Sequence, residues 1–351
     1  MNRIELTDPL YQLNDENLSK YKMAGYIATK TIDEIIKKMK PEIQLINLIQ
    51  LANNFIESEC EKVYKNIKYK GLAFPVCLSI NDIAGHYIPK ITDVTKEGDI
   101  IKIELGVHID GFPAFIGYST IINETNKKID DKRANVMKAV IEASKKIIKI
   151  MTPNYSNIDV TNLLKKYSEK YNCNLPICNE KGAIPGVFSY QISRYICDGY
   201  NSEEDEFIHK FILSKENPSF DFSQRETYFE ENEIYVIDIL MSTGNGKLNS
   251  INETNIYRRN FEMRSDLKLK SSREALVLFN NNRFPITLTN NSKIKLGIKE
   301  CINKKLLEIY PVVSEKKNEF IARIKFTVII KETPMLICGR PSDSELKKLI
   351  D

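Results

Sequence analysis

Apolar residues recur along much of the chain at the three-to-four-residue spacing of an amphipathic helix. This spacing predicts six helices, over residues 17–40, 43–64, 132–151, 159–171, 272–280 and 293–309. Pro41 ends the first helical pattern, and Ser156 or Asn157 is the expected N-cap of the fourth helix. The other apolar runs lack the helical period and therefore predict strands.

A continuous apolar run over residues 100–107 contains one acid, Glu104, among isoleucine, leucine and valine neighbours. Such runs are typical of strands buried on both faces, where a carboxylate needs a strong partner. The same design returns 134 positions later, where Asp238 is the single acid of the run over residues 234–241. This repeat predicts two similar half-structures whose acids face each other, although two short hairpins can also resemble each other by chance.

The last long apolar run, over residues 320–330, predicts a closing strand with Lys325 between Ile324 and Phe326. A buried cation on this strand points back toward the two buried acids. From residue 255 to residue 319 the pattern changes to short, basic, helix-rich pieces. The predicted parts are therefore a main domain of residues 1–254 and 320–351, with half-structures at about 70–125 and 205–250, and an inserted basic module of residues 255–319.

Composition sets the class of protein. The chain has 351 residues, 42% of them hydrophobic and 28% charged, which is enough for a substantial folded core. No apolar run approaches the roughly 18 residues of a membrane span, so we expect a cytoplasmic protein with the nucleus as a second compartment. Seven cysteines without a CxxC pair favour reduced thiols. With three histidines, any metal site would consist almost wholly of carboxylates.

The formal net charge is +4, but positive charge concentrates in the C-terminal third. Residues 250–351 contain 20 Lys and Arg against 12 Asp and Glu, an excess of eight. This excess favours an anionic partner, although many lysines simply solvate a surface. The candidate phosphate-contacting residues are Lys247, Arg258, Arg259, Arg264, Lys268, Lys270, Arg273, Lys293, Lys295 and Lys299.

Three motifs follow one another along the chain: AFPxxxSxNxxxxHxxP, GxHxDG and STGxGK. Their order resembles the methionine aminopeptidase superfamily, which implies the α+β pita-bread (creatinase/methionine aminopeptidase-like) fold with pseudo-twofold halves. A closer resemblance, to the proliferation-associated, ErbB-receptor-binding protein family, is carried by GLAFPVCLSIND, KEGDIIKIELGVHIDGF, TNIYRR and EFIARIKFTVII. That family is the branch without the metal site. The resemblance implies association with ribosomes and ribosomal RNA, modulation of translation, ribosome biogenesis and cell growth, and movement between cytoplasm and nucleolus.

The active enzymes of the superfamily hold two divalent metals with two acids eleven residues apart, one histidine and two glutamates. The resemblance places these ligands at Glu104, Phe115, Ser189 or Tyr190, Asp238 and Lys325. Four carboxylates balance two divalent ions, whereas Glu104, Asp238 and Lys325 leave about one net negative charge. We therefore expect no catalytic residue, no metal and no cofactor, with the lysine lying where the metals would be. His86 matches the substrate-side histidine of the enzymes, but alone it is more typical of an ordinary polar loop residue.

Two other functions stay open at this point. One is an aminopeptidase with a reduced, one-metal site built from Glu104, Asp238 and His86. The other is a module that holds nascent N-termini in the old pocket, where the bulky Phe115 and Tyr190 act as filler. The leading hypothesis has the ribosome and ribosomal RNA as partners, allows other protein partners, and expects a monomer without membrane contact.

Overall fold

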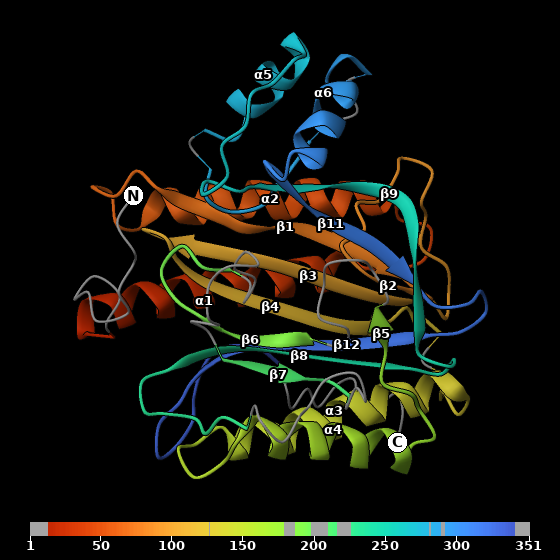
Figure 1. Cartoon of the computed structure of the whole chain (residues 1–351). Helices are drawn as coiled ribbons and strands as arrows, with labels where there is room; N and C mark the ends of the chain where they lie inside the picture. The colour runs from red at the N-terminus through yellow and green to blue at the C-terminus, as the bar shows by residue number, and fades with distance from the viewer. Residues whose placement is uncertain are drawn as a thin grey trace.

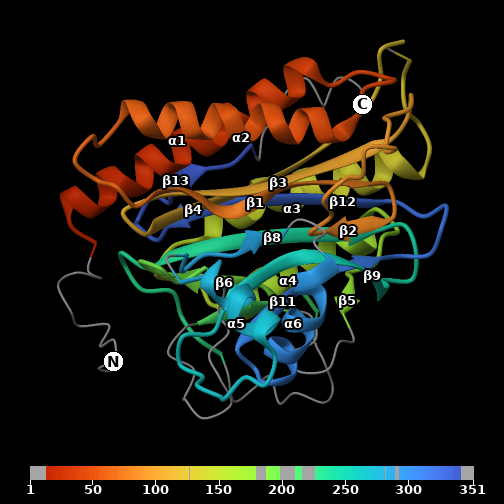
Figure 2. The ribbon, with the colours of Figure 1, turned by 90° about the horizontal axis from the view of Figure 1, so that it is seen from above.

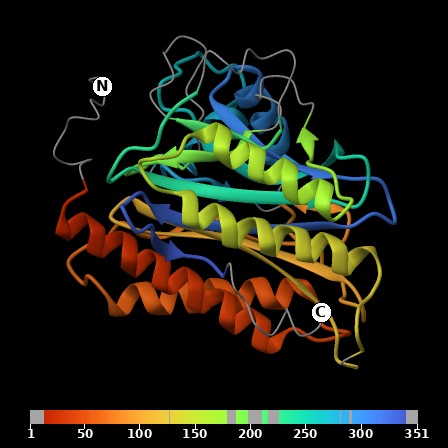
Figure 3. The same ribbon diagram turned by 90° about the horizontal axis from the view of Figure 1, so that it is seen from below.

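The computed structural model describes residues 13–125, 127–178, 187–197, 210–215, 226–280, 282–288 and 292–340. An eight-stranded antiparallel sheet forms the centre of this described part. A smaller sheet lies across one face of the large one (Figure 2). Four long helices cover the opposite face (Figure 3). The strands of the large sheet are therefore buried on both sides, which explains their continuous apolar runs.

The main sheet has the strand order β1-β3-β4-β12-β8-β6-β7, and β13 pairs with β12. Its strands are β1 (Lys70–Ile80), β3 (Ile100–Ile109), β4 (Phe112–Ile121), β6 (Val187–Ile192), β7 (Phe211–Leu213), β8 (Ile234–Ser242), β12 (Ile321–Ile329) and β13 (Met335–Cys338). β12 pairs with β4 on one side and with β8 on the other. The predicted closing strand therefore joins the two halves of the sheet.

A two-residue turn connects β3 and β4, whose pairing ends with Ile109 opposite Phe112. The turn residues Asp110 and Gly111 have φ of 54° and 82°. Two positive φ values are what a type I′ hairpin turn requires, and the Asp-Gly pair adopts them readily. This turn fixes the register of the hairpin and thereby the position of Glu104 within it.

The helices over the main sheet are α1 (Asp15–Lys38), α2 (Leu45–Lys62), α3 (Lys132–Ile150) and α4 (Asn157–Lys170). Their ends lie within two residues of the predicted ones. Side-chain caps begin three of them: Asn14 accepts from the Asn17 amide, Asp131 from the Arg133 amide, and Ser156 forms a capping box. α1 and α2 pack on β1, β3 and β4, whereas α3 and α4 pack on β12, β8 and β7. No helix of the described chain is long and apolar enough to cross a bilayer.

The second sheet has the order β10-β9-β11-β2, with β5 parallel to β9. Its strands are β2 (Ile83–Gly85), β5 (Ile177–Cys178), β9 (Lys247–Arg259), β10 (Ile286–Thr287) and β11 (Leu307–Ser314). Two short helices, α5 (Lys270–Val277) and α6 (Ser292–Asn303), project from this sheet away from the main one (Figure 1). They share a small separate core that includes Ala275, Phe279, Ile298 and Cys301.

The predicted helix over residues 293–309 is too long. α6 ends at Asn303, Lys305 has a φ of 55°, and from Leu307 onward the chain pairs with β9 as β11. The helical spacing of one segment carries no information about pairing with a distant strand. The predicted helix therefore extended past the turn at Lys305. The predicted start of the inserted module, residue 255, falls within β9, and its predicted end, residue 319, follows β11.

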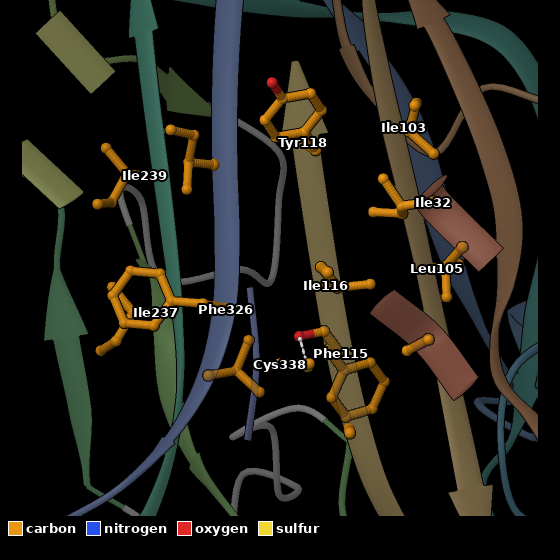
Figure 4. Packing of buried hydrophobic residues seen from close by; sticks show 14 of the residues in the cluster. Ile32, Ile103, Leu105, Phe115, Ile116, Tyr118, Ile237, Ile239, Phe326 and Cys338 are labelled. Carbon is orange, nitrogen blue, oxygen red and sulfur yellow. Dashed lines mark hydrogen bonds between the residues drawn. The ribbon is translucent and has the colours of Figure 1, made fainter. Parts of the chain in front are cut away.

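Packing in the core determines which way the charged strand residues point. Ile103 and Leu105 of β3 lie beside Ile32 of α1, as Figure 4 shows. Successive strand residues point to opposite faces of a sheet, so Glu104 faces the second sheet. The same alternation applies to β8, where Ile237 and Ile239 flank Asp238.

Candidate functional site

Three strands of the main sheet bring four charged side chains together between the two sheets. Glu104 comes from β3, Asp238 from β8, and Arg323 and Lys325 from β12. We call these four residues the buried quartet. Their exposed fractions are 2%, 2%, 4% and 6%, in that order. Lys325 is paired across the sheet with Asp238 and with Gly117, and Gly117 is paired with Glu104. Because Gly117 has no side chain, Lys325 reaches Glu104 across β4.

Every carboxylate oxygen of the quartet accepts a hydrogen bond from a cation. Arg323 donates from Nη1 to Glu104 Oε2, from Nε to Asp238 Oδ1 at 2.7 Å, and from Nη2 to Asp238 Oδ2. Lys325 donates from Nζ to Glu104 Oε1 and lies 2.9 Å from Asp238 Oδ2. Two negative and two positive charges therefore neutralise one another within a network in which every carboxylate oxygen has a donor.

For Glu104 and Arg323, the attraction of the opposite charges outweighs the effect of burial on the pKa. Burial raises the pKa of Glu104, but the charges of Arg323 and Lys325 overcome this effect and hold the pKa well below its usual range. Burial lowers the pKa of Arg323, while Asp238 and Glu104 raise it above its ordinary value. The Glu104 carboxylate and the Arg323 guanidinium are therefore both kept in their charged forms.

Arg323 corrects the charge balance that the sequence suggested. With Lys325 as the single cation, the site would carry one net negative charge, whereas Arg323 brings the sum to zero. The signal was present in the sequence, because Arg323 precedes Lys325 by two residues and strand alternation puts both on the same face. A close approach supports this arrangement: a Cβ on Gly85 would lie 2.5 Å from Arg323 Nη1. The absent side chain at Gly85 makes space for the guanidinium.

The remaining positions that match family metal ligands surround the quartet. Phe115 is buried, and its ring occupies the space that a Cβ on Gly106 would need, 2.5 Å from the ring edge. Ser189 is buried, and its hydroxyl accepts a 2.8 Å hydrogen bond from the Asp238 amide. Tyr190, on the same strand, lines a cavity beside the quartet. Neither the phenylalanine ring nor the lysine ammonium can coordinate a metal.

His86 follows β2 directly and adopts a φ of 61°, an uncommon conformation for a residue with a side chain. Its Nδ1 lies 3.1 Å from the Pro311 carbonyl, and its Nε2 lies 3.9 Å from Glu104 Oε1. Burial lowers the pKa of His86; the Glu104 charge opposes this shift, and the charges of Arg323 and Lys325 reinforce it. His86 is therefore held toward its neutral form.

A cavity of about 140 Å³ opens above the quartet between the two sheets. The strands β1, β2, β3, β4, β6, β8, β11 and β12 all contribute to it. Its lining consists of Phe74, Ala84, Gly85, His86, Glu104, Phe115, Tyr190, Cys197, Asp238, Leu240, Tyr310, Val313, Arg323 and Lys325. In the described chain, no three histidine, cysteine or acidic residues converge as a metal site would require. Both acids of the cavity are bound by cations, so this site does not fit a divalent metal centre.

The candidate phosphate-contacting residues whose side chains are described fall into two groups. Arg258 and Arg259 fasten β9 to β11: Arg258 pairs with Glu308 at 2.5 Å, and Arg259 donates to the Leu306 carbonyl at 2.9 Å. Lys293 belongs to α6, but its side chain lies outside the described part. The other candidates are exposed: Lys247 on β9, Arg264 and Lys268 before α5, Lys270 and Arg273 on α5, and Lys295 and Lys299 on α6.

Known proteins resemble the chain over nearly its whole length. The model of metallopeptidase family M24 matches residues 19–209. ERBB-3 binding protein 1 of Solanum tuberosum is 34% identical over 93% of this chain and 80% of its own length. Proliferation-associated protein A of Dictyostelium discoideum is 32% identical over 89% of this chain and 79% of its own length. A solved thermophilic Arx1 shares the fold, with a TM-score of 0.79, 21% identity, and coverage of 96% of this chain and 98% of its own.

Proposed function

We propose that this chain is a non-catalytic protein that binds ribosomes. The chain belongs to the ErbB-3-binding protein and proliferation-associated protein family within the M24 metallopeptidases. The observation that carries the proposal is the buried quartet. Hydrolysis by M24-type enzymes needs divalent ions that activate a water molecule. Here the two acids that remain are saturated by Arg323 and Lys325, which leaves neither ligands nor charge for such ions.

The projecting helices support the binding half of the proposal. Six cations, Arg264, Lys268, Lys270, Arg273, Lys295 and Lys299, are exposed on α5, α6 and the segment before α5. Among the described residues, Lys268, Lys295 and Lys299 form no ion pair, so their charges face solvent. Lysine and arginine side chains of this kind bind nucleic-acid phosphates and displace counterions. Ribosomal RNA is therefore the proposed partner of the helical projection.

The proposal also covers the setting in which the protein acts. We infer a monomer that modulates translation, ribosome biogenesis and growth in the cytoplasm and nucleolus, with room for further protein partners. The family resemblance supports these roles. None of them requires the cavity, so binding at the helical projection and the chemistry of the quartet are separable by mutation.

A salt series in ribosome co-sedimentation tests the binding half. The triple variant Lys268→Gln, Lys295→Gln, Lys299→Gln removes three exposed charges without touching a buried group. We expect weaker binding and a log–log salt slope flatter by about one unit for each phosphate that the variant no longer neutralises. The matched control is the triple variant Lys146→Gln, Lys149→Gln, Lys166→Gln. These three exposed lysines belong to α3 and α4, on the opposite side of the main sheet (Figure 3). Salt-independent binding, or equally weakened binding in both triple variants, would contradict the proposal.

A further inference from the structure

The cavity above the quartet is lined mainly by aromatic and aliphatic side chains. Phe74, His86 and Tyr310 contact one another, with ring centroids 5.3 Å apart for Phe74–His86 and Phe74–Tyr310 and 5.7 Å apart for His86–Tyr310. Leu240 and Val313 complete the apolar part of the lining. An engineered apolar cavity of about 150 Å³ accommodates one benzene ring. At about 140 Å³, this cavity has room for a single ring of that size.

Charge excludes ionic ligands from this space. The quartet sums to zero, and each of its carboxylate oxygens already accepts from Arg323 or Lys325. A ligand ammonium, such as a peptide N-terminus, would lose its hydration without gaining an unpaired acid. A ligand carboxylate would likewise meet cations that are already paired. The cavity therefore favours an uncharged molecule.

One polar atom of the lining is available to such a molecule. The Pro311 carbonyl can only accept, so the Nδ1 of His86, 3.1 Å away, carries the hydrogen, and the Nε2 of the neutral ring carries a lone pair. In the described chain this Nε2 receives no hydrogen bond. Glu104 Oε1 lies 3.9 Å from this Nε2 and is itself an acceptor. Because Glu104 Oε1 already accepts from Lys325, Nε2 of His86 is the atom that calls for a donor from a ligand.

The backbone of His86 gives an independent indication. Its φ of 61° lies in the left-handed region, which residues other than glycine adopt at an energetic cost. Residues in such strained conformations cluster at binding sites. The conformation turns the imidazole toward the quartet, and the side chain keeps a quarter of its surface exposed. His86 is therefore held at the boundary between the neutral network and the open part of the cavity.

We propose that the cavity binds one uncharged, phenol-like ring, whose hydroxyl donates to Nε2 of His86 while the ring packs against Phe74 and Tyr310. A ring of this chemistry occurs in free small phenols and at the end of a tyrosine side chain. The site differs from an aminopeptidase pocket, because it recognises a neutral donor in place of a charged amine. It also lies apart from the helical projection of α5 and α6.

Titration of the full chain with matched ligands, followed by protein NMR, tests this proposal. Phenol and toluene have nearly the same shape, but only phenol carries a donor. We expect phenol to bind about tenfold or more tightly than toluene, because toluene leaves Nε2 unpaired. Benzylammonium should bind more weakly than either. Comparison of p-cresol with N-acetyl-tyrosinamide then distinguishes a free phenol from a tyrosine side chain as the natural ring.

Two variants localise the effect. His86→Asn keeps a residue that tolerates positive φ, and it should reduce phenol affinity to the level of toluene while toluene affinity stays unchanged. Ala84→Val fills the cavity and should abolish both, whereas Ala73→Val, an equally buried strand alanine outside the lining, should not. Thermal unfolding verifies that the variants fold. Equal affinities for phenol and toluene, preference for benzylammonium, or phenol binding that survives Ala84→Val would overturn the proposal.

Discussion

At the scale of single residues, Arg323 has more influence on the buried quartet than Lys325 has. Its guanidinium makes three hydrogen bonds, one to Glu104 and two to Asp238, and so bridges β3 and β8. Lys325 adds one contact to each acid. Removing either cation leaves one uncompensated negative charge, but removing Arg323 also leaves more acceptor oxygens without a donor. The stability of the site therefore depends first on Arg323.

Substitution of the two cations separates their contributions. We expect Arg323→Met to lower the free energy of unfolding by about 3 to 5 kcal/mol and Lys325→Met by about 1 to 3 kcal/mol, because a buried acid without its partner is strongly unfavourable. Replacing all four members, with Glu104→Gln and Asp238→Asn added to both methionines, should recover much of the stability. Urea unfolding measures the three variants. Identical midpoints for the wild type and Arg323→Met would show that the guanidinium contributes nothing.

A second residue-scale prediction concerns Lys102, which lies two residues before Glu104 and is 1% exposed. Burial lowers the pKa of Lys102 to about 7, Arg323 reinforces the shift, and Asp82 and Asp99 oppose it. The unfolded chain, with a lysine pKa near 10.5, binds more protons than the folded chain between these values. The buried charge of Lys102 therefore lowers the free energy of unfolding by its full amount below pH 7. This loss of stability fades as the pH rises toward 10.5.

Lys102→Met should remove this dependence. We expect the variant to be more stable than the wild type at pH 6.5, on the order of 3 to 5 kcal/mol, with the gap narrowing steadily up to pH 10. Urea unfolding across this pH range measures the gap. Lys149→Met, at an exposed lysine of α3, is the control and should run parallel to the wild type. A gap between wild type and Lys102→Met that does not change with pH would contradict the argument.

The charged residues of the site differed in how readily the sequence predicted them. Glu104 and Asp238 were conspicuous, because each is the single acid in a run of apolar residues. Lys325 stood out between Ile324 and Phe326 for the same reason. Arg323 was missed although it shares the face of Lys325, because whether that face is buried depends on the second sheet. β2 supplies part of that cover from a segment far from β12 in the sequence.

At the scale of elements, the position of β2 next to β12 is as important as the main sheet. Gly85, the last residue of β2, leaves the space into which Arg323 extends. Four helices were predicted to within two residues, because their apolar spacing and caps are local features. The prediction failed over residues 304–309, where pairing of β11 with β9 overrides the local pattern. Contacts between distant strands are what the local pattern could not supply.

Gly85→Ala tests the packing of β2 on Arg323. The added Cβ would lie 2.5 Å from Arg323 Nη1 and 3.4 Å from Glu104 Oε2, so it would displace the guanidinium. We expect a decrease of about 1 to 3 kcal/mol in the free energy of unfolding in the wild-type background. In the Arg323→Met background the same change should cost far less, which a double-mutant cycle measures as a coupling energy. Additive effects would show that Gly85 and Arg323 do not constrain each other.

At the scale of the whole molecule, β12 closes one sheet from two halves and places both cations where the halves meet. The pita-bread fold could be predicted from motif order, and the repeat predicted that Glu104 and Asp238 would face each other. The repeat is less complete than expected, because β4 returns beside β3 whereas β9 leaves β8 for the second sheet. That crossing builds the cover over the quartet and carries α5 and α6 away from it (Figure 1).

The most direct test of the central claim, that Arg323 and Lys325 bind both acids and leave neither to hold a metal ion, is metal binding measured by calorimetric titration with Co²⁺ and Mn²⁺. The wild type should bind neither ion stoichiometrically. The double variant Phe115→Asp, Lys325→Glu should still bind the ions only weakly, because Arg323 remains paired with both acids. Adding Arg323→Gln to that pair should produce a marked gain in affinity, since a ligand set acts as a unit. Two metal ions bound per wild-type chain, or equal binding by the double and triple variants, would contradict the account.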